Sequence, residues 1–474
     1  MIFSLDQKTG NAPAVCTPDG TVVTYGELTE EIAALRPFFS TRQLVFCLCR
    51  NEPGALLGYL AALEWNSVPL LLDAALGKRQ LHTLFTAYAP SYFWAPTDET
   101  DRIGDLLKEE VFARKGYGLW KTDLPAYPMG DKLNLLLATS GSTGSPKLVR
   151  LSRRNVEANA DSIRRYLSLS ATERPITTLP FQYTYGLSVI NSHLLAGACL
   201  LMTRESYAQQ RFWDFFERAC ATSLSGVPYT YEILRRLSFF AQKPSHLTSL
   251  TQAGGKLPVE LQTEIGRWAQ KYGIRFYVMY GQTEATARMS YLPPERCLDK
   301  PGSIGIAIPG GELSLVDDRR NPIDRKDTVG ELVFRGENVS LGYAERREDL
   351  LLGDERRGIL YTGDLARRDE DGYYYIVGRR KRFVKLAGVR ISLDTCEALL
   401  RERFPGAEFA CTGDDDHLRI FGTDPEAVRQ GALWLPSCLH LNKKLFEGIC
   451  LPELPKNEAG KIQYAKLQSA EEGS

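Results

Sequence analysis

The sequence predicts an α/β protein with a large N-terminal domain and a small C-terminal α+β domain. Over most of the chain, short apolar runs alternate with amphipathic segments, which is the pattern of layered α/β sheets. From Pro309 the runs become shorter and are separated by Asp, Gly and Pro turns, which indicates a β subdomain within the large domain. A basic run that begins with glycine, Gly378–Arg382, then separates two folded-looking regions.

These observations give the domain boundaries. The chain has 474 residues, and single cores stop growing at roughly 250–300 residues. We expect a large domain over residues 1–378, a hinge over 379–382, and a small domain over 383–474.

Individual elements follow from periodicity and flanking residues. Ser152 is a candidate N-cap for a helix that ends near Leu167. Short apolar runs predict buried strands at Val45–Cys49, Val68–Leu72, Tyr92–Ala95 and Leu133–Ala138. Apolar spacing of three and four predicts helices at Ala55–Glu64, Val259–Lys271 and Leu393–Phe404. Short strands are expected at Glu312–Val316, Gly330–Arg335, Tyr373–Val377, Glu408–Thr412 and Leu418–Gly422.

Composition excludes several classes of partner. Lys+Arg and Asp+Glu number 58 each, so we expect neither nucleic acid nor a membrane surface as a partner. The N-terminus has no secretory signal pattern, and no apolar run is long enough to span a bilayer. The ten cysteines have no framework or metal-ligand spacing. We expect a cytoplasmic, reduced protein.

The segment Thr139–Lys147 carries the chemistry. It reads Thr-Ser-Gly-Ser-Thr-Gly-Ser-Pro-Lys, and such glycines, hydroxyls and a lysine suit a polyphosphate. It is not a Walker A loop, because Pro146 and Leu148 replace the second glycine and the magnesium-binding hydroxyl. The residues after Lys147 also read as a strand and not as a helix. A plain Ser/Gly-rich surface turn remains the alternative for the segment alone.

Four further motifs accompany this loop in order: Tyr280–Glu284, Tyr361–Asp364, Gly378–Arg379 and Pro455–Lys461. With them, and with Val22–Leu28 near the start, the chain resembles the adenylate-forming superfamily of acyl-CoA synthetases, luciferases and peptide-synthetase adenylation domains. The resemblance covers nearly the whole chain. It implies that a carboxylic acid attacks ATP to give an acyl-adenylate and pyrophosphate, and that a thiol then takes the acyl group.

The resemblance also implies roles for individual residues. ATP phosphates would be held by the loop, and Mg²⁺ by Glu284 together with the Ser142 hydroxyl. Asp364 would bind the ribose hydroxyls, and Arg379 would support the ribose or phosphate side. The phosphate-binding residues are Thr139, Ser140, Gly141, Ser142, Thr143, Gly144 and Lys147, and those lining adenine are Gly254, Gly255, Lys256, Tyr280, Gly281, Gln282 and Thr283.

Two lysines are expected to serve the two half-reactions. Lys461 resembles the family lysine that bridges the carboxylate and α-phosphate oxygens during adenylation. Lys385 resembles the lysine presented in the thioester-forming step, with one more solvated charge as its alternative. The family swings its small, mobile domain between the two steps, and the hinge position falls on Lys381. Lysine there resembles the acyl-CoA synthetase branch.

The acid and the thiol are less closely defined. Tyr183, Tyr185, Gly186 and Gly281 resemble the lining of the acyl pocket, although Tyr183 could equally belong to the core. Gln182 stands where amino-acid-activating domains have aspartate, so an α-amino acid is disfavoured. A fatty, hydroxy or aryl acid fits better. The acceptor is CoA or, alternatively, the phosphopantetheine arm of an acyl carrier protein, because residues 436–440 match the family poorly.

Two readings from other classes are disfavoured. A P-loop NTPase would give ADP and phosphate, whereas an adenylating enzyme gives AMP and pyrophosphate. A sensor that binds an acyl group or nucleotide without turnover would be expected to have lost some of Lys147, Glu284, Asp364, Arg379 and Lys461, and all five are present.

Overall fold

The computed structural model describes residues 1–138, 147–241, 243–386, 389–414, 417–439, 441–456 and 462–469. By compactness the chain divides into two units. The first is Met1–Leu313 with Phe334–Leu360, and the second is Ser314–Val333 with Tyr361–Ser474. The predicted hinge over 379–382 lies within the second unit. Compactness does not test a hinge, so this boundary stays a prediction.

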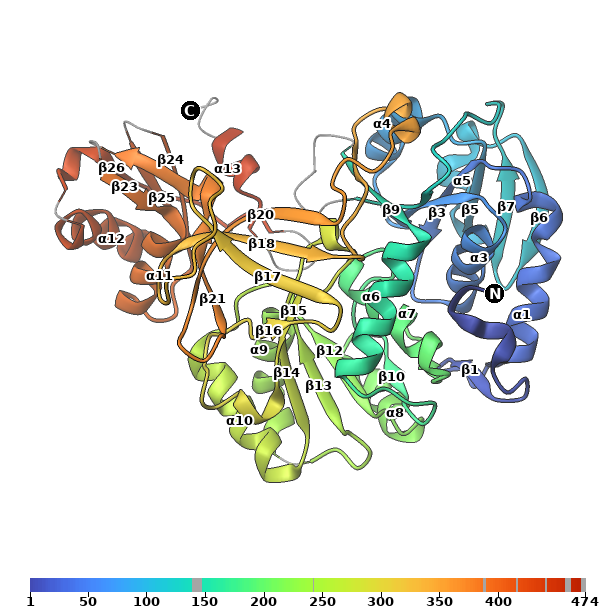
Figure 1. Cartoon of the computed structure of the whole chain (residues 1–474), viewed down its shortest axis with the longest axis horizontal. Coiled ribbons are helices and arrows are strands. Elements are labelled where there is room, and N and C mark those ends of the chain that lie inside the picture. Colours follow the sequence, from blue (N-terminus) through green and yellow to red (C-terminus); the bar gives the residue numbers. More distant parts are fainter. Residues whose placement is uncertain are drawn as a thin grey trace. The chain divides into compact units, whose positions relative to one another are not determined.

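A nine-stranded, mixed sheet carries one half of the first unit (Figure 1). Its order is β16-β15-β14-β13-β12-β10-β11-β1-β2, and the central strands run parallel. The strands are β16 (Ile306–Ala307), β15 (Ser290–Leu292), β14 (Arg275–Tyr280), β13 (Ser249–Gln252), β12 (Ser223–Gly226), β10 (Pro175–Ile176), β11 (Leu200–Leu201), β1 (Pro13–Cys16) and β2 (Val22–Thr24).

An eight-stranded sheet, in the order β19-β9-β8-β4-β3-β5-β7-β6, carries the other half. Its strands are β19 (Gly342–Ala344), β9 (Leu148–Ser152), β8 (Leu133–Ala138), β4 (Val68–Asp73), β3 (Leu44–Cys49), β5 (Tyr92–Pro96), β7 (Tyr117–Lys121) and β6 (Glu109–Arg114). The helices of this unit are α1 (Tyr25–Ala34), α2 (Arg36–Phe39), α3 (Pro53–Glu64), α4 (Lys78–Tyr88), α5 (Thr100–Ile103), α6 (Arg153–Tyr166), α7 (Thr184–Ala196), α8 (Gln210–Arg218), α9 (Pro228–Arg236) and α10 (Val259–Tyr272).

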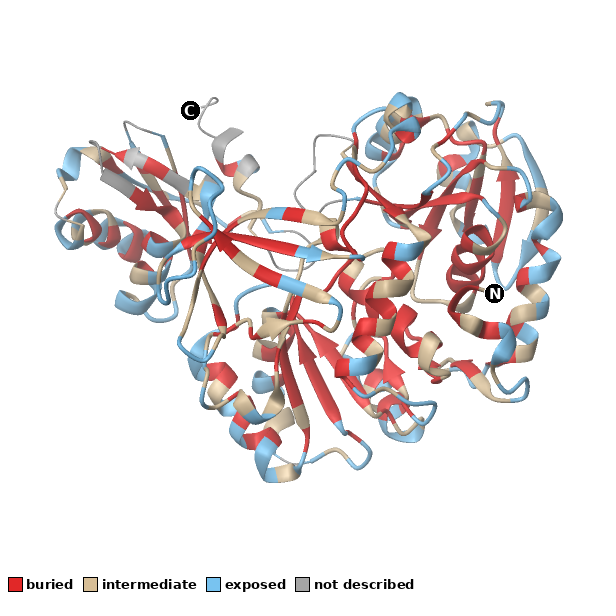
Figure 2. Cartoon of the chain, in the orientation of Figure 1, coloured by how far each residue is buried: buried red, intermediate tan, exposed pale blue. Residues whose placement is uncertain are grey.

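The strands and helices predicted best are those with a clear local sequence signal, such as an apolar run or a capping residue. All six residues of β3 are buried, as are five of the six in β4, because parallel central strands are covered on both faces. In Figure 2 the ribbon of β3 has the colour of buried residues. Ser152 caps α6 as predicted: its side chain accepts from the Asn155 amide, and the Asn155 side chain accepts from the Ser152 amide. Cys47 and Cys49 on β3 are buried free thiols.

The predicted strand–loop–strand setting of the segment Thr139–Lys147 is also confirmed. Strands β8 and β9 pair antiparallel on either side of it, with Leu137 opposite Val149. The loop therefore joins two strands and opens no helix, which excludes the Walker arrangement. Residues 139–146 themselves lie outside the described residues.

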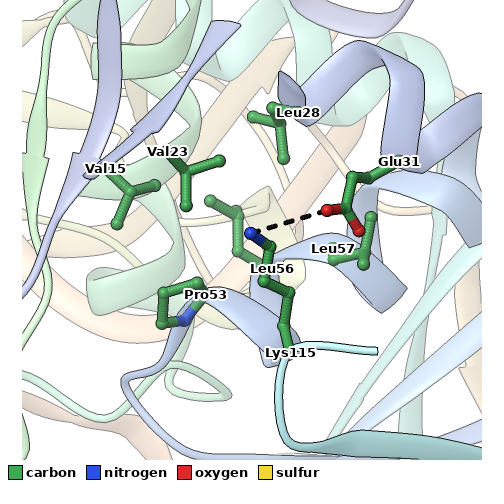
Figure 3. Close-up of a pocket in the computed structure, with 8 residues that line it drawn as sticks. All are labelled: Val15, Val23, Leu28, Glu31, Pro53, Leu56, Leu57 and Lys115. Carbon is green, nitrogen blue, oxygen red and sulfur yellow. Dashed lines mark ion pairs between the residues drawn. The ribbon is translucent and has the colours of Figure 1, made fainter. Parts of the chain in front are cut away.

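A small cavity of about 10 Å³ lies between β1, β2, α1 and α3. Figure 3 shows Lys115 directed into it toward Glu31, at 3.5 Å between Nζ and Oε1. Aliphatic side chains such as Leu56 form the rest of its wall. None of the predicted site residues lines it, so we interpret the ion pair as structural.

The second unit contains three sheets. The four-stranded sheet β17-β18-β20-β21 includes residues of both units, and the others are the hairpin β22-β23 and the sheet β24-β25-β26. The strands are β17 (Gly311–Val316), β18 (Gly330–Gly336), β20 (Ile359–Arg368), β21 (Tyr374–Arg379), β22 (Phe383–Leu386), β23 (Val389–Ser392), β24 (Phe409–Gly413), β25 (Leu418–Gly422) and β26 (Phe446–Cys450). Helices α11 (Leu393–Arg403) and α12 (Pro425–Cys438) pack on β24–β26, and α13 (Tyr464–Ser469) contacts β24.

The predicted α+β character of the C-terminal region is therefore confirmed. In the described part of the chain, no helix is long and apolar enough to cross a membrane.

Candidate active site

Tyr343 contacts two predicted site residues: Lys147, predicted to bind phosphate, and Glu284, predicted to bind the metal. Tyr343 lies on β19, which pairs with β9, opposite Val149. The Lys147 ammonium lies 3.8 Å from the centre of the Tyr343 ring, a cation–π contact. On the other side, the Tyr343 hydroxyl donates to Glu284 Oε1 at 2.7 Å. Two residues predicted from separate motifs thus share one partner.

Glu284 itself is set by a tight turn. It lies in the short 3-10 helix η5 (Thr283–Ala285) directly after β14. The turn folds back so closely that a Cβ at Gly281 would lie 1.6 Å from the Ala287 carbonyl oxygen. Gly281 is therefore required for the backbone path, whatever it contributes to adenine binding. The Glu284 backbone carbonyl also accepts from the Ser340 amide at 2.9 Å.

The carboxylate of Glu284 is suited to a divalent cation. It is half-buried, and among the described residues no hydrogen bond reaches its second oxygen, Oε2. Hard cations prefer carboxylate oxygens, and Mg²⁺ is usually held by one or two carboxylates plus substrate phosphates. The residues present therefore fit Mg²⁺ held jointly with a nucleotide. No protein-only cage of three or more acidic, His or Cys side chains occurs in the described ranges.

Three of the predicted acyl-pocket residues, Tyr183, Tyr185 and Gly186, are neighbours in the sequence. Tyr183 and Tyr185 lie at the start of α7, with ring centres 6.3 Å apart. Gly254 adopts a φ of +86°, and a Cβ there would lie 2.7 Å from the Tyr183 hydroxyl. A Cβ at Gly186 would lie 2.5 Å from the Pro180 carbonyl oxygen. Burial raises the pKa of Tyr183 to about 12, so its hydroxyl stays protonated at neutral pH.

Gln182 faces a charge that the sequence did not indicate. Its Nε2 donates to Asp73 Oδ2 at 2.5 Å, at the carboxyl end of β4. The glutamine is thus engaged by the protein itself. A second hydrogen bond, from the Thr184 hydroxyl to the Thr286 carbonyl, ties the start of α7 to the segment after Glu284.

In the second unit, Asp364 and Arg379 are partners. The pairing of β20 with β21 places them opposite each other, and Arg379 Nε donates to Asp364 Oδ1 at 3.1 Å. Asp364 is 3% exposed, whereas the Arg379 side chain is 63% exposed. Gly363 has a φ of +72°, which favours glycine before the aspartate.

The predicted hinge segment is anchored at its end. Arg382 donates from Nε to Asp394 Oδ1 and from Nη2 to Glu397 Oε1, each at 2.5 Å. Its guanidinium also lies 3.6 Å from the centre of the Tyr464 ring. Arg382 therefore belongs to the packing of α11 and α13. Lys381 and Lys385 lie in η8 (Arg380–Arg382) and β22, and only their backbones are described.

Several predicted residues remain untested. Lys461 lies outside the described residues, as does the loop Thr139–Gly144. Gly255 and Lys256 are exposed. Tyr343 and Arg288, which contacts the Tyr185 ring, were not predicted, because neither lies in a quoted motif and both reach the site only through the fold.

Comparison with known proteins decides the family. The model of the AMP-binding enzyme family matches residues 4–344. The chain belongs to the AMP-binding enzyme family. It is 32% identical to sulfoacetate–CoA ligase of Cupriavidus necator over 354 residues, covering 72% of this chain and 67% of that protein. It is 28% identical to 2-succinylbenzoate–CoA ligase of Bacillus pumilus over 463 residues, covering 94% and 93%.

Solved structures agree on the fold of this AMP-binding enzyme. O-succinylbenzoate coenzyme A synthetase from Bacillus subtilis, in complex with ATP and magnesium ion, has a TM-score of 0.76 at 21% identity and covers 98% of both chains. ATP-bound MatB from Rhodopseudomonas palustris has a TM-score of 0.77 at 22% identity over 99% of both chains. The predicted superfamily, fold class and enzyme class, an AMP-forming acid–thiol ligase, are confirmed.

The link through Tyr343 gives a first prediction. Tyr343→Phe keeps the ring against Lys147 but removes the hydroxyl that orients Glu284. We expect acid-dependent ATP–pyrophosphate exchange to fall about 10-fold, the usual effect of losing a hydrogen bond to a charged group. The matched control is Tyr88→Phe, since the Tyr88 hydroxyl donates to the neighbouring Ala344 carbonyl at 2.8 Å. Equal losses in both variants would contradict a role for Tyr343 in orienting Glu284.

Proposed function

We propose that this AMP-binding enzyme activates a small organic acid with ATP and Mg²⁺ and transfers the acyl group to CoA. The observation that carries the proposal is the cluster of Lys147, Tyr343 and Glu284. In this cluster the Lys147 ammonium and the Glu284 carboxylate both contact Tyr343, beside the paired strands β8 and β9. A nucleoside triphosphate needs a cationic group for its phosphates, and its metal ion needs a carboxylate ligand.

Each residue then has a task. Lys147 supplies positive charge to the polyphosphate. Glu284, oriented by Tyr343, supplies a carboxylate oxygen to Mg²⁺, which when bound neutralises phosphate charge. Asp364 accepts hydrogen bonds from the ribose hydroxyls, and Arg379 holds its carboxylate in place. Lys461 supplies the cation that joins the attacking carboxylate to the α-phosphate, and Lys385 serves the thioester-forming step.

The acid enters between the start of α7 and the turn after β14. Tyr183 offers apolar ring surface with a hydroxyl at its edge, which suits a small aliphatic or aryl acid, whereas Tyr185 is buried and its hydroxyl is bonded to Thr251. The Gln182 amide is neutral and supplies no counter-charge for an ammonium, and the nearby Asp73 carboxylate already accepts a hydrogen bond from that amide. We therefore keep the expectation that ordinary α-amino acids are poor substrates.

The test is acid-dependent ATP–pyrophosphate exchange over a panel of acids, followed by thioester assays with CoA and with a holo acyl carrier protein. We expect AMP and pyrophosphate as products, and a thioester with CoA. Thioester formation on the carrier protein alone would assign the enzyme to carrier loading, the alternative acceptor. Release of ADP and phosphate would contradict the proposal altogether.

A further inference from the structure

Arg288 is a buried cation without a counter-charge. The side chain is 2% exposed, and no Asp or Glu among the described residues lies within ion-pair distance of it. Arg150, also fully buried, has Glu355 at 2.5 Å from its Nη2. Burying an unpaired charge is costly, and proteins normally pair or neutralise such groups. Arg150 thus has a counter-charge, and the absence of one at Arg288 needs an explanation.

The contacts of Arg288 are all with neutral groups. Nε donates to Ser188 Oγ at 3.1 Å, and Nη1 donates to the Tyr166 hydroxyl at 3.2 Å. The guanidinium lies 4.3 Å from the centre of the Tyr185 ring, and Nη1 also contacts the Met279 sulfur. Within the described part of the chain, no hydrogen bond is made by Nη2. The N–H donors of Nη2 are therefore available.

The neighbouring tyrosines do not supply the missing negative charge. Burial raises the pKa of Tyr166 to about 12, and burial likewise raises the pKa of Tyr185. Both hydroxyls are therefore protonated at neutral pH. Burial also lowers the pKa of His193 to about 4, so this histidine adds no second cation nearby.

The position of Arg288 connects it with the acyl site. Its ring partner Tyr185 is one of the predicted acyl-pocket residues, and its hydrogen-bond partner Ser188 lies on the same helix, α7, about one turn further on. The Thr184–Thr286 hydrogen bond holds α7 against the segment that leads to Arg288. The positive charge of Arg288 also acts on Tyr183, where it opposes the rise of the tyrosine pKa caused by burial.

We propose that Arg288 binds a second anionic group of the acid, so that this AMP-binding enzyme prefers substrates with a carboxylate or sulfonate besides the carboxylate that is activated. The inference rests on the proposed function and specifies its substrate class. A guanidinium donates charge-assisted hydrogen bonds to an anionic oxygen, and Nη2 has N–H donors left for one. The second anion would supply the counter-charge that the protein lacks. A monoacid would leave Arg288 unpaired, and a site built in this way rejects the analogue that lacks the polar group.

The test compares length-matched acids in pyrophosphate exchange: butyrate with succinate, hexanoate with adipate, and benzoate with phthalate. In the unmodified enzyme, we expect at least one diacid to exceed its monoacid partner. Arg288→Met should lower kcat/KM for that diacid about 100-fold and change the monoacid by less than about 3-fold. Arg288→Lys, which keeps the charge, should retain part of the preference. The control is Arg165→Met, which removes an exposed arginine paired with Asp161 on α6.

Thermal unfolding separates this role from a structural one. Removing an unpaired buried charge should leave Tm unchanged or raise it in Arg288→Met. Equal losses for diacid and monoacid, together with a lower Tm, would overturn the inference. Exchange with monoacids only would also overturn it while leaving the proposed function intact. Exchange with no acid at all would overturn both.

Discussion

Lys461→Ala should abolish adenylate formation while leaving transfer from a supplied acyl-adenylate to the thiol intact. In the first half-reaction two anions, the carboxylate and the α-phosphate, must approach, and a lysine that bridges them stabilises charge in the transition state. We expect pyrophosphate exchange to fall roughly 1,000-fold, as for the loss of comparable charge-stabilising groups. Thioester formation from a chemically prepared acyl-adenylate should stay within about 3-fold.

The control for this prediction lies in the same motif. Lys456 donates to Glu408 Oε1 at 2.5 Å, so Lys456→Ala removes a nearby lysine that already has a structural partner. We expect this variant to keep exchange activity. Lys385→Ala should show the opposite defect, with normal exchange and slow thioester formation. If Lys461→Ala retained normal pyrophosphate exchange, Lys461 would not be the adenylation lysine.

Local sequence patterns predicted those strands and helices that form because of their own residues and immediate neighbours. The strands β3, β4 and β8 are rich in apolar residues, and Ser152 is followed three residues later by an amide that completes its cap. Helix α12 was missed because Pro436, which usually marks a helix end, lies inside it. Helix α7 was missed because its first turn was interpreted only as pocket lining.

The site was predictable as a set of residues and not as an arrangement. Asp364 and Arg379 were assigned separately, and their pairing depends on the register of β20 against β21. Tyr343 could not be found from its neighbourhood, since its role arises when β19 pairs with β9, a segment distant in sequence. Arg288 was missed for a similar reason. An arginine in a sequence is usually exposed, and only the packing of α6, α7 and β14 makes this one a buried, unpaired cation.

Glu284→Gln should remove most metal-dependent activity without unfolding the protein. Glutamine has nearly the same shape and can still accept the Tyr343 hydrogen bond, but it lacks the negative charge that a hard cation prefers. We expect pyrophosphate exchange to fall about 100-fold, the effect of weakening metal-assisted charge neutralisation at the phosphates. The Mg²⁺ concentration needed for half-maximal exchange should rise, because the remaining ligands are the nucleotide's own oxygens and uncharged groups.

The matched control is Glu345→Gln, which removes the other carboxylate near Lys147. Glu345 Oε1 lies 3.7 Å from the Lys147 ammonium, and its side chain is 62% exposed. Exposed ion pairs contribute little, so this variant should keep both its exchange rate and its Mg²⁺ requirement. If Glu284→Gln lowered activity with an unchanged Mg²⁺ requirement, Glu284 would act through Tyr343 and Lys147 alone. The combined variant Glu284→Gln with Tyr343→Phe distinguishes the two roles. A tyrosine that acts only by orienting Glu284 should have little further effect once the carboxylate is gone.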